Sequence, residues 1–336
     1  MTTNATPSNG PNNGLEREAA DLNATIVAAR DAVAQVIFGQ DRVIDESLIT
    51  LLAGGHALLI GVPGLAKTRL VETLGAVLGL AEKRVQFTPD LMPADILGSE
   101  VLEEGADGSR AFRFIKGPVF CQLLMADEIN RASPRTQAAL LQAMQEGRVS
   151  IAGHYHPLPE PFHVLATQNP LEQEGTYPLP EAQLDRFLMQ IDVGYPDLEA
   201  ERRMLLATTA GPQPKPPMVM DGARLLAAQT LIRQLPVGEA VVDSILALVR
   251  GGRRETSTLP EIDRHVAWGP GPRAAQALML AARARALMDG RLSPSVDDVI
   301  QLAPPILRHR MALSYTARAD GVSVDHIIAK LIETIA

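Results

Sequence analysis

Cysteine is nearly missing from this chain of 336 residues, and aromatic residues make up only 4% of it. The lone cysteine, Cys121, excludes an intrachain disulfide and fits a reducing compartment. No apolar run approaches the about 20 residues that a membrane-spanning helix needs, and residues 1–14 lack the basic and apolar segments of a secretory signal. We therefore expect a soluble, cytoplasmic protein that does not insert into a membrane.

Positive charge is also in short supply. The chain carries 31 Lys and Arg against 39 Asp and Glu, a net charge of −8. Residues 1–200 alone hold 14 basic and 26 acidic side chains. Because strand binding needs cationic grooves, this balance disfavours a nucleic-acid partner.

The sequence does contain a regular alternation of short apolar runs with stretches of helical periodicity. The segments expected to be strands are residues 56–60, 84–87, 122–126, 162–166 and 189–193, of which 56–60 and 122–126 are the continuous apolar runs. Continuous runs of this length are typical of strands buried on both faces of a parallel sheet. The pattern predicts an α/β fold over residues 15–195, with a five-stranded parallel sheet sandwiched by helices.

The pattern changes on both sides of this region. Residues 1–14, rich in Thr, Asn, Pro and Gly, are expected to form a disordered tail. After residue 195 a proline-rich stretch, 208–218, predicts a linker, and the remaining periodicity is helical. We expect residues 196–336 to form a small all-α domain, with helices at 223–234, 239–250, 272–288 and 295–301.

The strongest chemical signal lies between the first expected strand and the helix after it. That segment is Gly61, Val62, Pro63, Gly64, Leu65, Ala66, Lys67 and Thr68. In such a loop backbone N–H groups cradle phosphate oxygens, Lys67 reaches the β- and γ-phosphates, and the Thr68 hydroxyl binds Mg²⁺. The usual pattern has glycine where Ala66 stands, so a Gly/Pro turn before an ordinary helix is the alternative.

Polar residues end two further buried strands. Asp127 and Glu128 follow the run 122–126, at the sheet edge where α/β proteins bind ligands. Asp127 would hold Mg²⁺ and Glu128 would activate the attacking water, although such a pair can also simply cap a helix. Asn169 follows the next run and could hydrogen-bond that water or the γ-phosphate. Otherwise it is a turn former before Pro170.

Two arginines could complete such a site. Arg186 lies just before the last strand, where it could reach the γ-phosphate of a neighbouring subunit and stabilise the transition state. The alternative is a surface salt bridge with Asp185 or Glu181. Arg273 begins a helix in the second domain, and because a basic residue there opposes the helix dipole, an anion elsewhere should account for it.

Together these motifs resemble the MoxR family of AAA+ ATPases over about residues 22–336. The residues that carry the resemblance are 36–40, 61–68, 86–90, 95–98, 117–118, 126–132, 166–170, 179–187 and 272–274. The resemblance implies an AAA+ P-loop NTPase core followed by a helical lid. It also implies that residues 98–114 form an insert within helix 2, where clustered acidic residues would equally fit a solvated loop. A hairpin is expected over residues 149–158, and its segment 150–158 matches a second insert.

The resemblance assigns each candidate residue a role in one ATP site. The roles are Walker A for Lys67 and Thr68, Walker B for Asp127 and Glu128, sensor 1 for Asn169, arginine finger for Arg186, sensor 2 for Arg273, and adenine pocket for Val36, Ile37 and Gly39. In related proteins sensor 2 can act in cis or in trans. Arg131 is a candidate for a further trans contact.

The resemblance also implies a function. It implies ATP hydrolysis with Mg²⁺ in a homo-oligomeric, hexameric ring, coupled to chaperone-like remodelling of partner proteins. Partners in the family often contain von Willebrand factor A domains, and clients include metalloenzymes that await their cofactor. Two alternatives remain open: a chelatase-like subunit that drives metal insertion into a small molecule, and a nucleotide-gated scaffold with negligible turnover.

Overall fold

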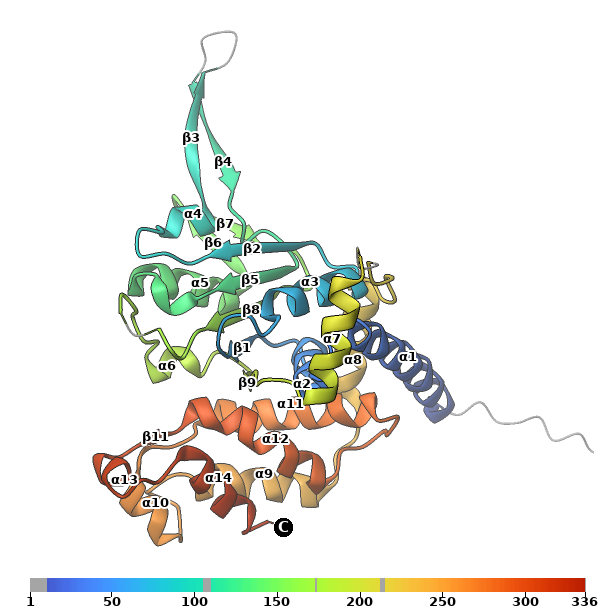
Figure 1. Ribbon diagram of the computed structural model, residues 1–336, viewed down its shortest axis with the longest axis vertical. Helices are drawn as coiled ribbons and strands as arrows, with labels where there is room; N and C mark the ends of the chain where they lie inside the picture. The colour runs from blue at the N-terminus through green and yellow to red at the C-terminus, as the bar shows by residue number, and fades with distance from the viewer. Residues whose placement is uncertain (1–10, 105–109, 173, 212–214, 336) are drawn as a thin grey trace, which may run out of the picture.

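A parallel sheet of five strands, in the order β2-β5-β8-β1-β9, lies at the centre of the molecule (Figure 1). It is seen in a computed structural model that describes residues 11–104, 110–172, 174–211 and 215–335. The strands are β1 Ala57–Ile60, β2 Glu82–Gln86, β5 Leu123–Asp127, β8 His163–Gln168 and β9 Met189–Asp192. All five predicted strands are confirmed.

Helices cover both faces of this sheet. They are α1 Pro11–Ala34, α2 Asp41–Leu52, α3 Lys67–Val77, α4 Pro93–Leu97, α5 Pro134–Glu146 and α6 Glu181–Leu184, with the 3-10 turn η1 Ile129–Arg131. Leu59 packs into the cluster that contains α1, α2 and α3, whereas its neighbour Leu58 packs into a second cluster with α5. Successive strand residues point to opposite faces, so each strand contributes to both layers.

The N-terminal boundary differs from the prediction. Helix α1 begins at Pro11, within the segment expected to be a tail, and residues 1–10 lie outside the described residues. Proline is well tolerated in the first turn of a helix, where its missing N–H has no partner to lose. The composition of residues 11–14 therefore concealed the start of the helix.

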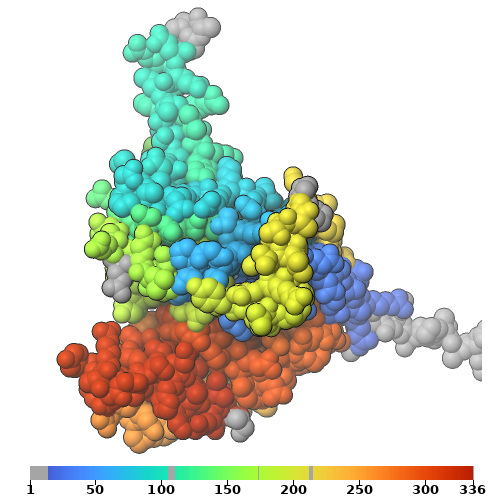
Figure 2. All heavy atoms as spheres, viewed as in Figure 1, coloured from blue at the N-terminus to red at the C-terminus, as the bar shows by residue number. Residues whose placement is uncertain are grey.

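Two antiparallel hairpins interrupt the α/β order. The longer one, β3 Gly98–Glu104 with β4 Arg110–Lys116, stands clear of the rest of the molecule (Figure 2). The shorter one is β6 Arg148–Ile151 with β7 His154–Pro157. The rings of Phe114 and His156 stack with centroids 4.0 Å apart, which joins the two hairpins. The described part of residues 98–114 is thus sheet rather than an irregular loop.

Residues 198–335 are mostly helical where they are described. The helices are α7 Leu198–Thr209, α8 Gly222–Gln234, α9 Glu239–Gly251, α10 Pro260–His265, α11 Pro272–Met288, α12 Val296–Leu307, α13 Tyr315–Ala319 and α14 Val324–Ile332, with the 3-10 turn η2 Arg308–Arg310. Among the described residues, no helix combines the length and the apolar character needed to cross a membrane.

Two features of this region are not predicted from the sequence: a short strand pair, which departs from the all-α prediction, and one helix. Strand β10 Val266–Trp268 pairs with β11 Ala312–Leu313. Strands of two and three residues are too short to produce a periodic pattern. The sequence also does not predict α7, in which Ala200 is the only buried residue. A helix without an apolar face has no periodicity to detect.

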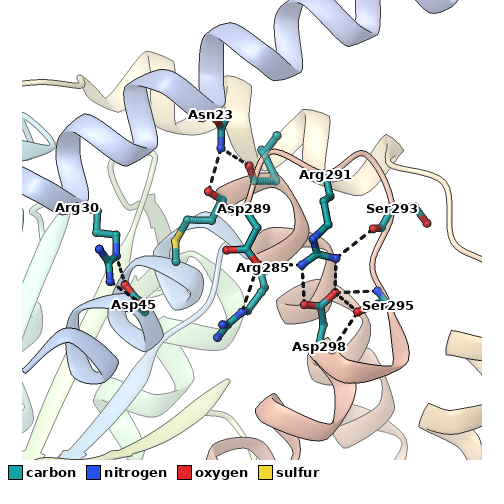
Figure 3. Close-up of polar contacts among 11 residues, drawn as sticks. Asn23, Arg30, Asp45, Arg285, Asp289, Arg291, Ser293, Ser295 and Asp298 are labelled. Atoms are coloured by element: carbon teal, nitrogen blue, oxygen red, sulfur yellow. Dashed lines mark hydrogen bonds and ion pairs between the residues drawn. The ribbon is translucent and has the colours of Figure 1, made fainter.

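The C-terminal helices are fastened to the α/β part. One cluster of buried apolar side chains runs from α1, α2 and the sheet into α8, α11, α12 and α14. Asn23 of α1 donates from Nδ2 to the carbonyl oxygens of Leu287 and Met288, at 2.8 and 2.9 Å, where α11 ends (Figure 3). Such terminal carbonyls have no partner within their own helix, so this contact both caps α11 and ties it to α1.

Two enclosed histidines make the stability of the fold sensitive to acid. His163 Nδ1 contacts the Gly55 carbonyl oxygen at 2.8 Å and its Nε2 contacts Gln229 Nε2 at 3.2 Å. His56 Nδ1 accepts from the backbone N–H of Val164. Each neutral ring thus has a donor and an acceptor satisfied, and a second proton would face another donor. Burial lowers the pKa of His163 to about 4 and that of His56 to about 3.

We therefore expect the free energy of unfolding to fall as the pH drops from about 6.5 towards 4, because only the unfolded chain takes up these protons. The slope should be about 1.4 kcal/mol per pH unit for each histidine. Urea unfolding at pH 7.5 and pH 5 measures it. The His163→Asn variant should show a smaller loss than wild type, whereas the exposed His326→Gln control should match wild type. Equal losses in all three proteins would contradict this account.

Candidate active site

The loop between β1 and α3 has the backbone shape of a phosphate cradle. Gly64 and Ala66 both adopt left-handed conformations, with φ of +87° and +56°. Ala66, the N-cap of α3, takes the place of the usual glycine at a cost of about 1–2 kcal/mol. Gly61 is required by packing, because a Cβ there would lie 2.6 Å from the carbonyl oxygen of Val193. The loop turns sharply into a helix N-terminus, where phosphate groups bind.

Lys67 folds back over this loop. Its ammonium donates hydrogen bonds to the carbonyl oxygens of Gly61 and Val62. Partial burial lowers the pKa of Lys67, and the carboxylates of Asp127 and Glu128 oppose this shift. One positive and two negative charges therefore lie close enough to interact, as a site for a triphosphate and a divalent cation requires.

Asp127 ends β5 and is buried. The Thr167 hydroxyl donates to its Oδ1 at 2.6 Å, and the Arg84 guanidinium donates to its Oδ2 at 2.6 and 3.1 Å. The Asp127 carboxylate and the Thr68 hydroxyl are hard oxygen donors, the kind that Mg²⁺ takes. The chemistry of this donor pair fits a magnesium ion.

Glu128 adopts a left-handed conformation with φ of +55°. Gln86 and Arg131 both donate to its Oε2, at 2.7 and 3.1 Å, and its own backbone N–H donates to Thr167 Oγ1 at 2.9 Å. Its side chain makes no capping bond to η1, so the helix-cap alternative is not realised. A non-glycine residue in this conformation, held by several contacts, is typical of an active site.

Asn169 lies just beyond β8, the strand between β5 and β1. Its Oδ1 accepts a hydrogen bond from the backbone N–H of Leu171 at 3.1 Å. This is the turn-forming contact named above as the alternative. The turn uses the amide oxygen, and the amide nitrogen is the group that could donate to a phosphate.

The two arginines lie at a different place from the loop. Arg273 of α11 approaches Asp185 Oδ2 at 3.6 Å, and Arg310 donates to Asp185 Oδ1 at 2.8 Å. No ion pair joins Arg186 to Asp185 or Glu181 among the described residues, and Arg186 Nε is buried without a hydrogen-bond partner there. The salt bridge considered as the alternative for Arg186 is thus absent, because arginines of the C-terminal helices occupy Asp185.

An apolar hollow of about 410 Å³ opens beside the phosphate loop. Val36 and Ile37 line it, as does Met204 of α7. Gly39 does not line the hollow; with φ of +66° it lets α7 pack closely, since a Cβ there would overlap Ala200. Mostly apolar walls next to a phosphate cradle suit a flat heterocycle such as adenine.

Known proteins match this chain over both of its parts. The model of the ATPase family associated with various cellular activities (AAA) matches residues 56–189, and that of the AAA lid domain matches residues 261–331. The chain is 43% identical over 327 residues to Chaperone MoxR1 of Mycobacterium tuberculosis, an alignment that covers 97% of this chain and 85% of that protein. The chain belongs to the MoxR family of AAA+ ATPases.

A further member of the MoxR family and a solved structure support this family assignment. Protein MoxR of Methylorubrum extorquens is 34% identical, with 90% of this chain and 92% of that protein aligned. A crystal structure of an ATPase candidate from Cytophaga hutchinsonii superposes with a TM-score of 0.88 at 37% identity, covering 96% of this chain and 97% of that one. The predicted AAA+ core and following lid are therefore confirmed as the fold.

Three contributors to this MoxR-family site are not predicted from the sequence. Arg84 and Gln86 lie on β2 and bond the two carboxylates, and Thr167 bonds both Asp127 and Glu128. Their positions depend on β2 and β8 flanking β5. No local motif shows that these strands are neighbours, although Gln86 and Thr167 both lie within segments that carry the family resemblance.

Proposed function

We propose that this MoxR-family protein binds ATP with Mg²⁺ and hydrolyses it in a hexameric ring, and that hydrolysis drives the remodelling of partner proteins. The observation that carries the proposal is the division of the site. The phosphate loop and both acidic residues belong to one edge of the sheet, whereas Arg186 and Arg273 lie together elsewhere. A site divided in this way is completed by a neighbouring copy.

Each group has a place in the reaction. The hollow beside Val36 and Ile37 would take the adenine, and the loop amides with Lys67 would bind the β- and γ-phosphates. Magnesium, held by Thr68 and Asp127, would neutralise charge on the phosphates. Glu128 would orient the attacking water and accept its proton.

The two arginines are proposed to act in trans. Helix α6, which Arg186 follows, lies on the left of Figure 1, and α7, which borders the adenine hollow, lies on the right. Arg273 shares Asp185 with Arg310, so it lies beside Arg186 rather than beside the hollow of its own chain. This placement favours the trans assignment of sensor 2.

The remodelling role rests on family membership and on the longer hairpin. Chaperone MoxR1 is a chaperone by name. Hairpin β3–β4 projects from the molecule and exposes Leu102 and Phe112, which face each other across the strands. Exposed apolar pairs of this kind suit contact with a protein. We propose that the clients include proteins with von Willebrand factor A domains or metalloenzymes under maturation.

The test is nucleotide binding and turnover. Calorimetry in magnesium buffer should show ATP binding that Lys67→Ala weakens by about 10- to 100-fold, since a charge-assisted hydrogen bond is worth about 1.5–3 kcal/mol. Lys330→Ala, which changes a partly exposed lysine of α14, is the matched control and should bind as wild type does. Phosphate release by the wild type would exclude the scaffold alternative. Folded protein that ignores ATP would refute the proposal.

A further inference from the structure

Arg310, in the turn η2, is buried to 2% exposure and uses its whole guanidinium. Nη1 donates to the carbonyl oxygens of Leu188 and Ile306 at 3.0 and 2.6 Å. Nη2 donates to those of Phe187 and Asp185 at 2.6 and 3.3 Å, and Nε donates to Asp185 Oδ1 at 2.8 Å. One side chain of the C-terminal part therefore binds three carbonyl groups of a single four-residue segment.

That segment, residues 185–188, carries Arg186. The neighbouring His309 adds a further contact from Nε2 to the Phe187 carbonyl oxygen at 3.0 Å. The backbone is thus held on both sides of Arg186, at positions 185 and 187. Asp185 is held as well, with one carboxylate oxygen on Arg310 and the other near Arg273. The acid next to Arg186 in the sequence is therefore not available to pair with it.

Removing a guanidinium from water costs free energy, and a gain in stability alone does not explain why Arg310 is buried. Burial lowers the pKa of the Arg310 guanidinium, and the Asp185 carboxylate opposes that shift. Well-packed apolar residues often replace a buried ion pair at no loss of stability. What an apolar side chain cannot do is fix the orientation of three carbonyl groups of one segment, those of Asp185, Phe187 and Leu188. Orientation matters here, because a misplacement of about 1 Å at a reacting centre can cost about 100-fold in rate.

We infer that Arg310 is a positioning residue for catalysis between subunits: it holds segment 185–188 so that Arg186 forms no ion pair with Asp185 and is directed at the neighbouring subunit. This inference rests on the proposed function of Arg186. Because Arg310 is buried, it is not placed to touch a substrate. It acts by fixing the backbone of Arg186 and by keeping Asp185 occupied.

Arg310→Lys tests the inference, since lysine keeps the charge but cannot bridge three carbonyls and a carboxylate. We expect kcat for ATP to fall by about 100-fold, with the dissociation constant for ATP within about twofold of wild type, because the variant's own pocket is intact. Asp185→Asn is the second variant in case lysine at position 310 prevents folding. It keeps the shape of the side chain and removes the charge, and the same split is expected.

Mixed assembly separates positioning from a general structural effect. Glu128→Gln subunits lack the proposed base but keep Arg186, so co-assembly with Arg310→Lys or Asp185→Asn subunits should restore phosphate release per intact pocket. Arg291→Gln is the control for lost stability, because Arg291 also pairs with a buried aspartate, Asp298, at 2.7 Å but lies in the loop between α11 and α12 (Figure 3). It should melt earlier than wild type and turn over ATP normally.

The outcomes distinguish the two proposals. Folded Arg310→Lys and Asp185→Asn that keep wild-type kcat, or that lose it without recovery on mixing, would overturn the positioning role. Arg186→Ala mixed with Glu128→Gln is the reference. If phosphate release recovers in this mixture but not in the mixture with Arg310→Lys, the positioning role of Arg310 is refuted and the role of Arg186 stands. If phosphate release does not recover in the mixture with Arg186→Ala, both the arginine-finger role of Arg186 and the positioning role of Arg310 are refuted.

Discussion

Arg186→Ala should lower ATP turnover by assembled rings by about 10³–10⁵-fold, the range over which arginine fingers act in NTPases. The physical reason is the charge that builds up on the γ-phosphate oxygens in the transition state. Arg186 is suited to meet it because Asp185 is already occupied by Arg310 and Arg273. ATP affinity should change little, because in the proposed ring the residues that bind the nucleotide belong to the neighbouring chain.

The measurement is phosphate release at saturating ATP, with assembly followed by light scattering. Arg318→Ala, an exposed arginine on α13, serves as the matched control and should keep both assembly and turnover. Wild-type turnover by intact Arg186→Ala rings would show that this arginine is not the finger. Loss of assembly together with turnover would mean that Arg186 acts in holding subunits together.

Glu128→Gln should lower turnover by about 10²–10⁴-fold, the usual contribution of a general base. Glutamine has the same shape and can still accept hydrogen bonds from Gln86 and Arg131 through its amide oxygen. It cannot take a proton from water. ATP should therefore bind without being hydrolysed, and the ring should remain in its ATP-bound form together with any client.

Single-turnover phosphate release and calorimetric ATP binding on the same sample test this expectation. Glu172→Gln is a sharp control, because Glu172 also pairs with Arg131, at 3.6 Å. If the effect came only from releasing Arg131, both variants would lose turnover equally. If Glu128 is the base, only Glu128→Gln should. Normal turnover by Glu128→Gln would refute its assignment.

Much of the fold could be predicted from the sequence because its signals are local. Strands β1, β5 and β8 contain short apolar runs, and α2, α5 and α11 show the spacing of an apolar face. The sequence does not predict helix α7 because its leucines, such as Leu205 and Leu206, face solvent. The sequence does not predict the pair β10–β11 because it joins segments far apart in the chain, Val266 with Leu313. Pairing over such distances leaves no local pattern.

The same division holds for the candidate site. Lys67, Asp127 and Glu128 could be named because each lies in a short motif at the end of a strand. Arg84 and Arg310 could not. Arg84 reaches Asp127 only because β2 lies beside β5, and Arg310 meets segment 185–188 from more than a hundred positions away. Such residues become visible only when the strand order and the packing of η2 are known.

The uninterrupted core between the sheet and the C-terminal helices has a mechanical consequence. Among the described residues, Asn23 and the shared apolar cluster join these two parts directly. A displacement felt at the phosphate loop would be carried through α1 and α11 to the opposite side of the same subunit. In the proposed ring, each protomer would then move as one rigid unit, and flexibility would lie at the contacts between protomers.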